Sequence, residues 1–328
     1  MRLLKFLILI AALMLMSPAA HRGYAGLSSR TFDFVYSVTV RDIPQNATRL
    51  DLWIPVPQTT AHQEISNLKI DCKYPQQILV EPEYKNKMAY VNIKGKLPRE
   101  LEMTLSCTAV RKSVSSPDNP EQISDAVLQR FLKPDRLVPI DGKIAAEASS
   151  AIAEKKEATA EEKARAIFDD VTETMIYDKS RPGWGRGDAI YACDARRGNC
   201  TDFHSLFIGM ARASSIPSKF VIGFPLPSGK ASGEIPGYHC WAEFYIKGKG
   251  WLPVDASEAY KHPEKHDFFF GGLDANRIEL TTGRDISLQP STAYAKPLNY
   301  FIYPFVLIDA KPWPKVEKHF SFANIRHS

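Results

Sequence analysis

Residues 31–113 restrict the possible folds more than any other part of the chain, because apolar and polar side chains alternate there with a period of two. The clearest run, 31–40, is rich in β-branched and aromatic residues. Five similar runs follow with Pro, Asn, Asp and Gly between them, at 49–56, 65–72, 78–80, 88–93 and 101–110. Short strands at this spacing are typical of an antiparallel β-sandwich, which we expect over residues 26–114.

The pattern changes to a helical one after this region. Residues 115–120 have the composition of a linker, and 121–132 and 141–156 have helical patterns, so 115–158 is predicted to be a helical connector. Thr159 and Glu162 have the spacing of a capping box. This box opens a helix whose apolar residues recur three and four apart until about Tyr177.

The rest of the chain alternates between helix and strand patterns. Residues 200–213 have helical periodicity, and strands are predicted at 219–224, 239–246, 250–254, 277–281 and 300–308. The sequence therefore predicts a second domain over residues 159–290. A strand extension is predicted to follow over residues 291–328.

The first 25 residues have the pattern of a secretory signal peptide. Arg2 and Lys5 precede an unbroken apolar run at 6–16. This run is too short to span a bilayer, which takes about 20 residues. Small residues then offer two cleavage sites, after residue 19 or residue 25. We expect export to the periplasm or the medium, and an uncleaved N-terminal anchor is the alternative.

Composition and charge exclude several classes of protein. The chain is 44% hydrophobic and 24% charged, which is usual for globular proteins. Of the formal net charge of +5, Arg2, Lys5 and Arg22 of the leader supply three, and no dense Lys/Arg stripe alternates with aromatic residues. Nucleic-acid binding is therefore not expected. No later apolar run is long enough to span a bilayer, so no stable membrane insertion is expected after cleavage.

Three segments carry side chains suited to thiol catalysis. A turn at Gly198–Asn199 places Cys200 at the start of a predicted helix, where the helix dipole favours a thiolate. His239 begins one predicted strand and Asp255 follows the next. If these strands form a hairpin, the two side chains meet at one edge of the sheet. The arrangement provides a nucleophile, a base and a residue that orients the base.

The motifs that carry these residues resemble, in their order, the transglutaminase-like superfamily, relatives of papain-type thiol enzymes. They are Gly198-Asn-Cys200, Ile216-Pro217, His239-Cys-Trp241, Gly250-Trp251 and Val254-Asp255, and the resemblance covers about residues 160–260. It implies an α+β fold whose nucleophile helix packs on an antiparallel sheet, with Cys200 as nucleophile, His239 as base and Asp255 as its orienting partner. A β region followed by such a core resembles the exported bacterial members of this superfamily.

The resemblance implies acyl transfer from a protein or peptide amide through a thioester, without a cofactor. Hydrolysis is mildly favoured over cross-linking, because water needs no second binding site. One alternative is a non-catalytic binding or assembly module of the cell envelope on the same scaffold. Another is a zinc hydrolase that uses Cys200 and His204, four residues apart, with His239 or Cys193. No metal is expected, because C-x-x-C and H-E-x-x-H motifs are missing from the sequence. Trp184 and Tyr238 are candidates for the substrate groove.

An oxidising compartment leaves at least one of the five cysteines unpaired within the chain. We expect Cys200 to be the free thiol, because catalysis needs it. Cys72 and Cys107 both lie in predicted strands of the sandwich and are expected to pair. Side chains alternate along a strand, so Cys240 is expected to face away from the site and to pair with Cys193. The alternative is that Cys193 and Cys240 both stay reduced.

Overall fold

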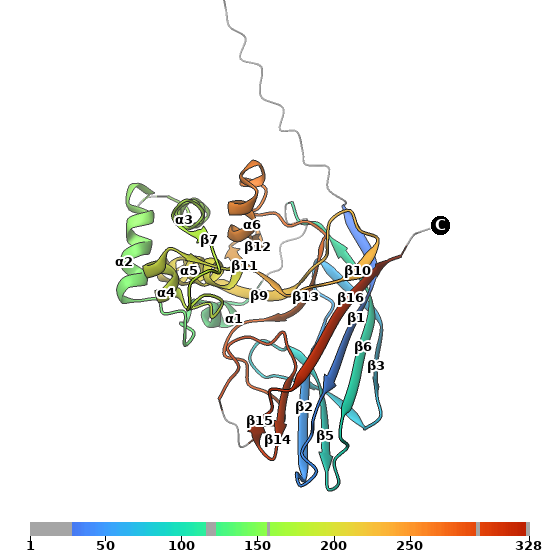
Figure 1. Ribbon diagram of the computed structural model, residues 1–328. Coiled ribbons are helices and arrows are strands. Elements are labelled where there is room, and N and C mark those ends of the chain that lie inside the picture. Colours follow the sequence, from blue (N-terminus) through green and yellow to red (C-terminus); the bar gives the residue numbers. More distant parts are fainter. Residues whose placement is uncertain (1–27, 116–122, 156–157, 293–295, 326–328) are drawn as a thin grey trace, which may run out of the picture.

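The computed structural model describes residues 28–115, 123–155, 158–292 and 296–325. The predicted signal peptide and most of the predicted linker at 115–120 lie outside these residues. None of the helices in the described residues combines the length and the apolar character that a membrane span needs. Figure 1 shows long strands on one side of the molecule and helices that cover a separate sheet on the other. The mixed fold with antiparallel sheets that the sequence predicts is confirmed.

Two five-stranded antiparallel sheets form the β-sandwich. One has the order β10-β16-β1-β6-β3 and the other the order β15-β14-β2-β5-β4. Along β1, Phe32, Phe34 and Tyr36 are buried while their neighbours are more exposed, as the period of two predicts. The strands are β1 (Ser29–Val40), β2 (Arg49–Val56), β3 (Gln63–Cys72), β4 (Gln76–Val80), β5 (Lys87–Lys94), β6 (Leu101–Lys112), β10 (Ser232–Glu234), β14 (Phe305–Ile308), β15 (Lys311–Pro312) and β16 (Val316–Asn324).

The end of the described chain completes both sheets of the sandwich. β16 lies antiparallel to β1, with Phe320 opposite Tyr36, and β14 lies antiparallel to β2. The strand predicted at 300–308 is thus present over its second half, as Phe305–Ile308. Strands from the two ends of the sequence therefore share one hydrophobic core.

All α-helices of the described residues follow strand β6 in the sequence, between Asp125 and Lys261. The capping box before α3 is confirmed, because the Thr159 side chain accepts a hydrogen bond from Glu162 N and the Glu162 side chain accepts one from Thr159 N. α3 ends at Thr174, before the predicted end near Tyr177. α4 lies in a stretch for which the sequence predicts no helix. The helices are α1 (Asp125–Leu128), α2 (Gly142–Ala151), α3 (Ala160–Thr174), α4 (Ala189–Ala195), α5 (Cys200–Ala213) and α6 (Ala256–Lys261), with 3₁₀ turns at Gln129–Leu132, Ala153–Lys155 and Pro263–Lys265.

A four-stranded antiparallel sheet with the order β12-β11-β9-β13, which we call the core sheet, packs against α5. β11 and β12 form the predicted hairpin. A Cβ on Gly223 of β9 would lie 1.8 Å from the carbonyl oxygen of Ile278, so only glycine lets β13 approach this closely. The strands are β9 (Ser218–Pro225), β11 (His239–Ile246), β12 (Gly250–Val254) and β13 (Arg277–Thr282), and a small parallel pair consists of β7 (Ile176–Tyr177) and β8 (Arg197–Gly198).

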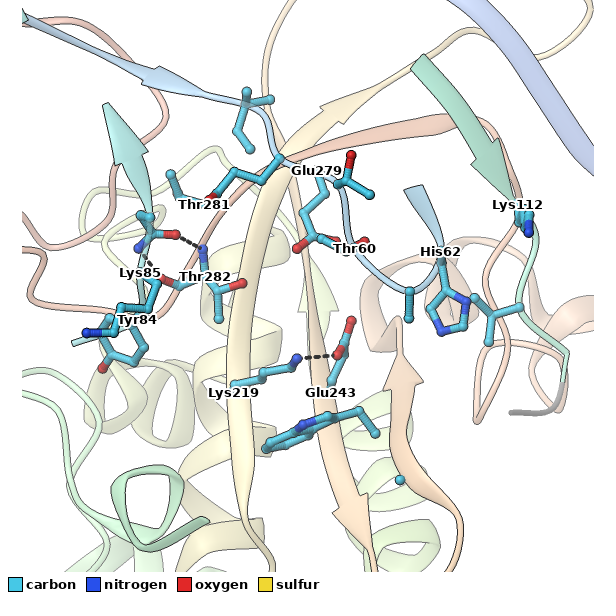
Figure 2. Close-up of a pocket in the computed structure, with 18 of the residues that line it drawn as sticks. Thr60, His62, Tyr84, Lys85, Lys112, Lys219, Glu243, Glu279, Thr281 and Thr282 are labelled. Carbon is cyan, nitrogen blue, oxygen red and sulfur yellow. Dashed lines mark hydrogen bonds and ion pairs between the residues drawn. The ribbon is translucent and has the colours of Figure 1, made fainter. Parts of the chain in front are cut away.

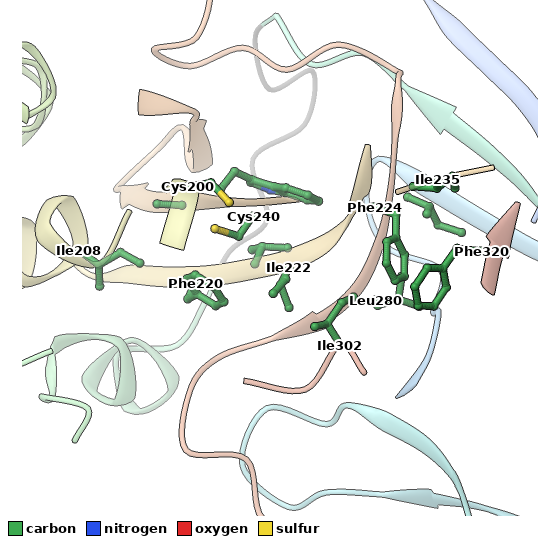
Figure 3. Packing of buried hydrophobic residues seen from close by; sticks show 14 of the residues in the cluster. Cys200, Ile208, Phe220, Ile222, Phe224, Ile235, Cys240, Leu280, Ile302 and Phe320 are labelled. Carbon is green, nitrogen blue, oxygen red and sulfur yellow. The ribbon is translucent and has the colours of Figure 1, made fainter. Parts of the chain in front are cut away.

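One continuous hydrophobic cluster joins the core sheet to the sandwich. Phe224 of β9 lies against Phe320 of β16, with ring centroids 4.2 Å apart. Figure 3 shows this contact together with the buried side chains that lead from it towards Cys200 and Cys240. The core sheet is thus fixed to the sandwich by packing.

Candidate active site

Cys200 is the first residue of α5, and a buried capping box fixes where that helix begins. The Asn199 side chain accepts a hydrogen bond from Thr201 N at 2.9 Å, and Asp202 Oδ2 accepts one from Asn199 N at 2.9 Å. A Cβ on Gly198 would lie 2.3 Å from Asp202 Oδ2, so the turn before the helix requires glycine. The predicted turn and helix start therefore place the thiol at the positive end of the helix dipole.

The structure brings Cys200, His239 and Asp255 together. His239 Nε2 lies 2.7 Å from Asp255 Oδ2, and the imidazole also hydrogen-bonds the Cys200 thiol. Because Nε2 faces the carboxylate, Nδ1 is the nitrogen left for the sulfur. β11 and β12 lie side by side, so the start of one strand and the end of the other meet at the edge of the core sheet. Cys200 is 3% exposed, His239 6% and Asp255 0%.

The surroundings favour a thiolate and an imidazolium in this cluster. A hydrogen bond from Cys240 is the largest influence on Cys200, and with the charge and hydrogen bond of His239 it holds the pKa of the thiol well below its usual value despite burial. Burial works against the charged imidazole, but the charge and hydrogen bond of Asp255, with the contribution of Cys200, raise the pKa of His239 to about 10. Both shifts favour a proton on His239 over a proton on the sulfur.

Asp255 stays charged although it is fully buried. Burial favours the protonated acid, but His239 and Arg277 hold the pKa of the Asp255 carboxyl well below its usual range. Arg277 Nη1 donates to Asp255 Oδ2 at 2.9 Å. The other oxygen, Oδ1, accepts from Glu258 N at 3.1 Å and from the Ser257 hydroxyl at 3.2 Å. Sequence reasoning missed Arg277, which comes from a strand 22 residues further along the chain.

His204, a candidate zinc ligand in the sequence, links two parts of the site. Its Nε2 accepts a hydrogen bond from Ala256 N at 3.1 Å, so its Nδ1 carries the proton and donates to the Cys200 carbonyl oxygen at 2.7 Å. Burial lowers the pKa of His204, which agrees with a neutral ring. Among the described residues, no three His, Cys, Asp or Glu side chains are arranged to hold a metal ion.

The two candidates for the substrate groove differ in position. The Tyr238 hydroxyl accepts a hydrogen bond from Asn199 Nδ2 at 3.1 Å, and burial and the charge of Cys200 raise the pKa of Tyr238. Tyr300 and Tyr303 of the C-terminal segment lie beside it, each with ring centroids 5.8 Å away. Trp184 is 38% exposed, and its ring lies under Lys179 at 5.7 Å. Tyr238 therefore borders the thiol, whereas the contacts of Trp184 do not include the three site residues.

The predicted disulfides are wrong in the structure, since all five cysteines lie in the described residues and all are free. Cys72 and Cys107 lie in neighbouring strands of one sheet, but Cys72 is opposite Met103, four residues from Cys107. Cys193 Sγ lies 3.7 Å from a Glu147 oxygen.

Cys240 forms no disulfide with Cys193, its predicted partner. Its sulfur lies 3.6 Å from His204 Nδ1 and contacts the Cys200 thiol. The expectation that Cys240 faces away from the site is also wrong. α5 packs against β11, the strand that carries Cys240, and this packing brings the Cys200 thiol next to Cys240.

A cavity of about 760 Å³ lies between the sandwich and the core sheet, away from the three site residues. Figure 2 shows Lys219, Glu243 and Glu279 of the core sheet facing loops of the sandwich that carry Thr60 and His62. Lys219 Nζ and Glu243 Oε2 form an ion pair at 2.8 Å. Because Cys200, His239 and Asp255 are not among the residues that line it, this cavity is separate from the candidate active site.

Comparisons with known proteins agree with this geometry. Residues 147–256 match the family model of the transglutaminase-like superfamily. An uncharacterised protein of Haemophilus influenzae is 26% identical in an alignment 322 residues long, and the alignment covers 86% of each chain. A crystal structure of a candidate cysteine protease from Cytophaga hutchinsonii is 19% identical, covers 92% of each chain and superposes with a TM-score of 0.59. The chain therefore carries a domain of the transglutaminase-like superfamily, in a fold that it shares with the Cytophaga hutchinsonii protein.

Proposed function

We propose that this protein is an exported, thiol-dependent amide hydrolase or acyltransferase that acts on protein or peptide amides through Cys200, His239 and Asp255. One observation carries the proposal. The Cys200 thiol at the start of α5 contacts one side of the His239 ring, and Asp255 Oδ2 lies 2.7 Å from the nitrogen on the other side. The match to the superfamily supports a cysteine-dependent enzyme.

The proposed reaction passes through a thioester. The Cys200 thiolate attacks the amide carbonyl carbon, and the tetrahedral oxyanion accepts a hydrogen bond from Cys200 N, which as a first-turn helix N–H has no partner within the helix. The His239 imidazolium then gives its proton to the leaving amine, and the C–N bond breaks. Asp255 holds the ring in place and balances its charge.

The thioester is next attacked by an acceptor, with neutral His239 as the base. Water gives a carboxylic acid, and a primary amine gives a new amide. We favour water, because it needs no binding site of its own, whereas an amine acceptor needs a second specific site beside the thioester. Both routes return the proton to His239 and free the Cys200 thiolate.

Export is the part of the proposal that depends on residues 1–25. A charged start, an 11-residue apolar run and small residues at two cleavage positions support a removable signal peptide. Expression of the full chain in a Gram-negative host, fractionation and N-terminal sequencing test this. A mature N-terminus after residue 19 or 25 in the periplasm is expected, whereas an intact Met1 in the membrane fraction would contradict cleavage.

The activity is tested by incubating the protein with a peptide library and a primary amine, with products resolved by mass. Wild-type protein is expected to cleave amide bonds, and Cys200→Ala to give no product. Amine-linked peptides would change the acceptor assigned here but not the thioester step. Products that persist in Cys200→Ala would contradict the thiol mechanism. No product from either protein, with slow thiol labelling, would instead favour a binding module.

A further inference from the structure

Arg277 contacts Asp255, one of the three proposed site residues. It is the first residue of β13, and its side chain is 4% exposed. Its Nη1 donates to Asp255 Oδ2 at 2.9 Å, and this is the same oxygen that contacts His239 Nε2 at 2.7 Å. A single buried carboxylate oxygen therefore lies between a guanidinium and the imidazole.

Packing fixes the position of this guanidinium. Its central carbon lies 5.1 Å from the centroid of the Trp241 ring, and Nη2 lies 3.5 Å from Asp274 Oδ2. The guanidinium of Arg111 lies 5.7 Å from the same Trp241 ring. The close approach of β13 to β9 at Gly223 holds the strand from which Arg277 extends. A side chain with these contacts has little freedom to leave Asp255.

The charge of Arg277 matters most after His239 has lost its proton. A buried carboxylate without a cationic partner is costly and tends to take up a proton. His239 supplies positive charge only while it is protonated. An arginine stays protonated throughout the accessible pH range, so its charge at Asp255 does not change when the imidazole becomes neutral.

We propose that Arg277 is a positioning residue that keeps Asp255 ionised and aligned on His239 both before and after His239 gives up its proton. This inference rests on the proposed function, because it assigns Arg277 a role in the same proton transfer. Arg277 does not touch the thiol or the substrate carbonyl in this role. It acts through Asp255.

The sign of the effect on the site follows from charge. Loss of one buried positive charge makes protonation of the Cys200 thiolate easier and loss of the His239 proton harder. The pH midpoint of thiolate formation therefore rises when Arg277 is neutralised. Other titratable or charged groups act on Cys200, His239 or Asp255 from the surrounding elements: Tyr177, Asp202, His204, Tyr238, Cys240, Lys261, Tyr300 and Tyr303. Arg111, Glu258 and Asp274 act on Arg277 itself, and Arg284 acts on Cys240.

The test compares the pH dependence of iodoacetamide labelling at Cys200, read from its peptide by mass spectrometry. Arg277→Met is expected to raise the pH at which labelling of Cys200 is half-maximal by at least about half a pH unit. A shift of this size is expected when a buried positive charge next to the Asp255 carboxylate is removed. Arg277→Lys keeps the charge and is expected to stay near the wild-type midpoint, even if looser packing lowers stability. Should Arg277→Met fail to fold, Arg277→Gln removes the same charge and keeps a hydrogen-bond donor.

Arg212→Met is the matched control. Arg212 Nη1 contacts Asp135 Oδ2 at 2.6 Å, and both side chains are 1% exposed, so this is also a buried Arg–Asp pair. It lies near the other end of α5, about 18 Å along the helix from Cys200. Arg212→Met is expected to lower stability but to leave the labelling midpoint unchanged.

Two results would overturn the inference: a wild-type midpoint in the charge-free Arg277 variant, or an equal shift in Arg277→Lys. Failure of the proposed function looks different. In that case, the wild-type protein itself shows slow labelling of Cys200 that increases only at alkaline pH.

Discussion

At the level of single residues, Cys200 and Cys240 are chemically identical side chains in contact with each other, yet their surroundings act on them in opposite directions. Burial and the hydrogen bond to Cys200 raise the pKa of Cys240 well above its usual value. The hydrogen bond from Cys240 and the contact with His239 lower that of Cys200. One thiol is therefore suited to donate a hydrogen bond, and the other is the nucleophile that we propose. We expect Cys240 to remain protonated at neutral pH.

Substitutions of the three site residues are expected to separate chemistry from folding. Cys200→Ala removes the nucleophile and should abolish turnover, with the free energy of unfolding changed by only about 1 kcal/mol, because one sulfur atom at a helix start is lost. His239→Ala should abolish turnover and slow the labelling of Cys200. Asp255→Asn should keep more turnover than either, because the neutral side chain can still contact the ring. Turnover by mass-resolved products and unfolding in urea measure the two effects.

The order of these three effects is what the account requires. Turnover in His239→Ala equal to that of the wild-type protein would remove the imidazole from the mechanism. Loss of folding in Cys200→Ala would mean that the thiol is structural. Arg30→Ala is the control for the loss of a buried polar side chain outside the site. Arg30 lies in β1 of the sandwich and hydrogen-bonds Asn276 and Asn324.

The sequence could predict the candidate catalytic residues but not those that support them. Cys200, His239 and Asp255 lie at element boundaries that local patterns show. Arg277 and Tyr300 reach the site from strands and loops that follow Asp255 by 22 and 45 residues, and the sequence patterns do not indicate this. The prediction that Cys240 faces away from the site is wrong, because alternation along a strand does not tell how the helix packs against it.

At the level of elements, the start of α5 does more than end a turn. Asp202 accepts hydrogen bonds from three backbone N–H groups, those of Asn199, Gly185 and Gly187, at 2.7 to 3.0 Å. The carboxylate thus fixes both the first turn of the helix and the loop before α4. Its pKa is nevertheless raised, chiefly because it is buried.

Asp202→Ala is expected to lower the free energy of unfolding by about 2–4 kcal/mol, because buried N–H groups lose their acceptor. It should also slow labelling of Cys200, whose position depends on the helix start. Thr159→Ala provides the matched control, because it breaks the capping box of α3, at an exposed site, and should cost only about 1 kcal/mol. Urea unfolding and peptide-resolved labelling measure both effects. Equal costs with unchanged Cys200 labelling would contradict the role assigned to Asp202.

Element types were predictable where the pattern was long. The strands of the sandwich, the β11–β12 hairpin and the helices α3 and α5 follow from periods of two and from apolar residues three and four apart. α4 has seven residues, too few for a clear helical period, and its start depends on Asp188 accepting hydrogen bonds from Ile190 N and Tyr191 N. Side-chain caps of this kind are hard to distinguish from turns in a sequence.

At the level of the whole molecule, the sandwich depends on the end of the chain. Val306, Leu307, Phe320 and Phe322 of β14 and β16 are buried in the hydrophobic core. Each buried side chain of this size contributes about 1.5–3 kcal/mol, and a domain has only about 5–15 kcal/mol of net stability. The sequence predicts a strand at 300–308 and a strand extension over residues 291–328, but the partners β1 and β2 lie more than 250 residues earlier, beyond any local signal.

A chain that stops after Pro304 keeps all three site residues but loses β14, β15 and β16. We expect it to be unfolded or aggregated, because the stability lost is about as large as the net stability of a domain and because the edges of β1 and β2 become exposed. Size-exclusion chromatography and near-UV circular dichroism measure this. Removal of residues 326–328 is the control and should leave folding unchanged. A shortened chain that unfolds cooperatively at the wild-type temperature would contradict this dependence.

The activation of the Cys200 thiol is tested by the rate at which iodoacetamide labels it from about pH 5 to pH 9. The labelling rate of Cys72 in the same protein is the reference. Cys72 is partly exposed, and burial raises its pKa, so its rate should still increase about tenfold per pH unit near neutrality. A lowered Cys200 pKa predicts a rate that is already near its maximum at about pH 7, and a marked slowing at that pH in His239→Ala. A Cys200 rate that increases in parallel with that of Cys72, and does not respond to His239→Ala, would contradict an activated nucleophile.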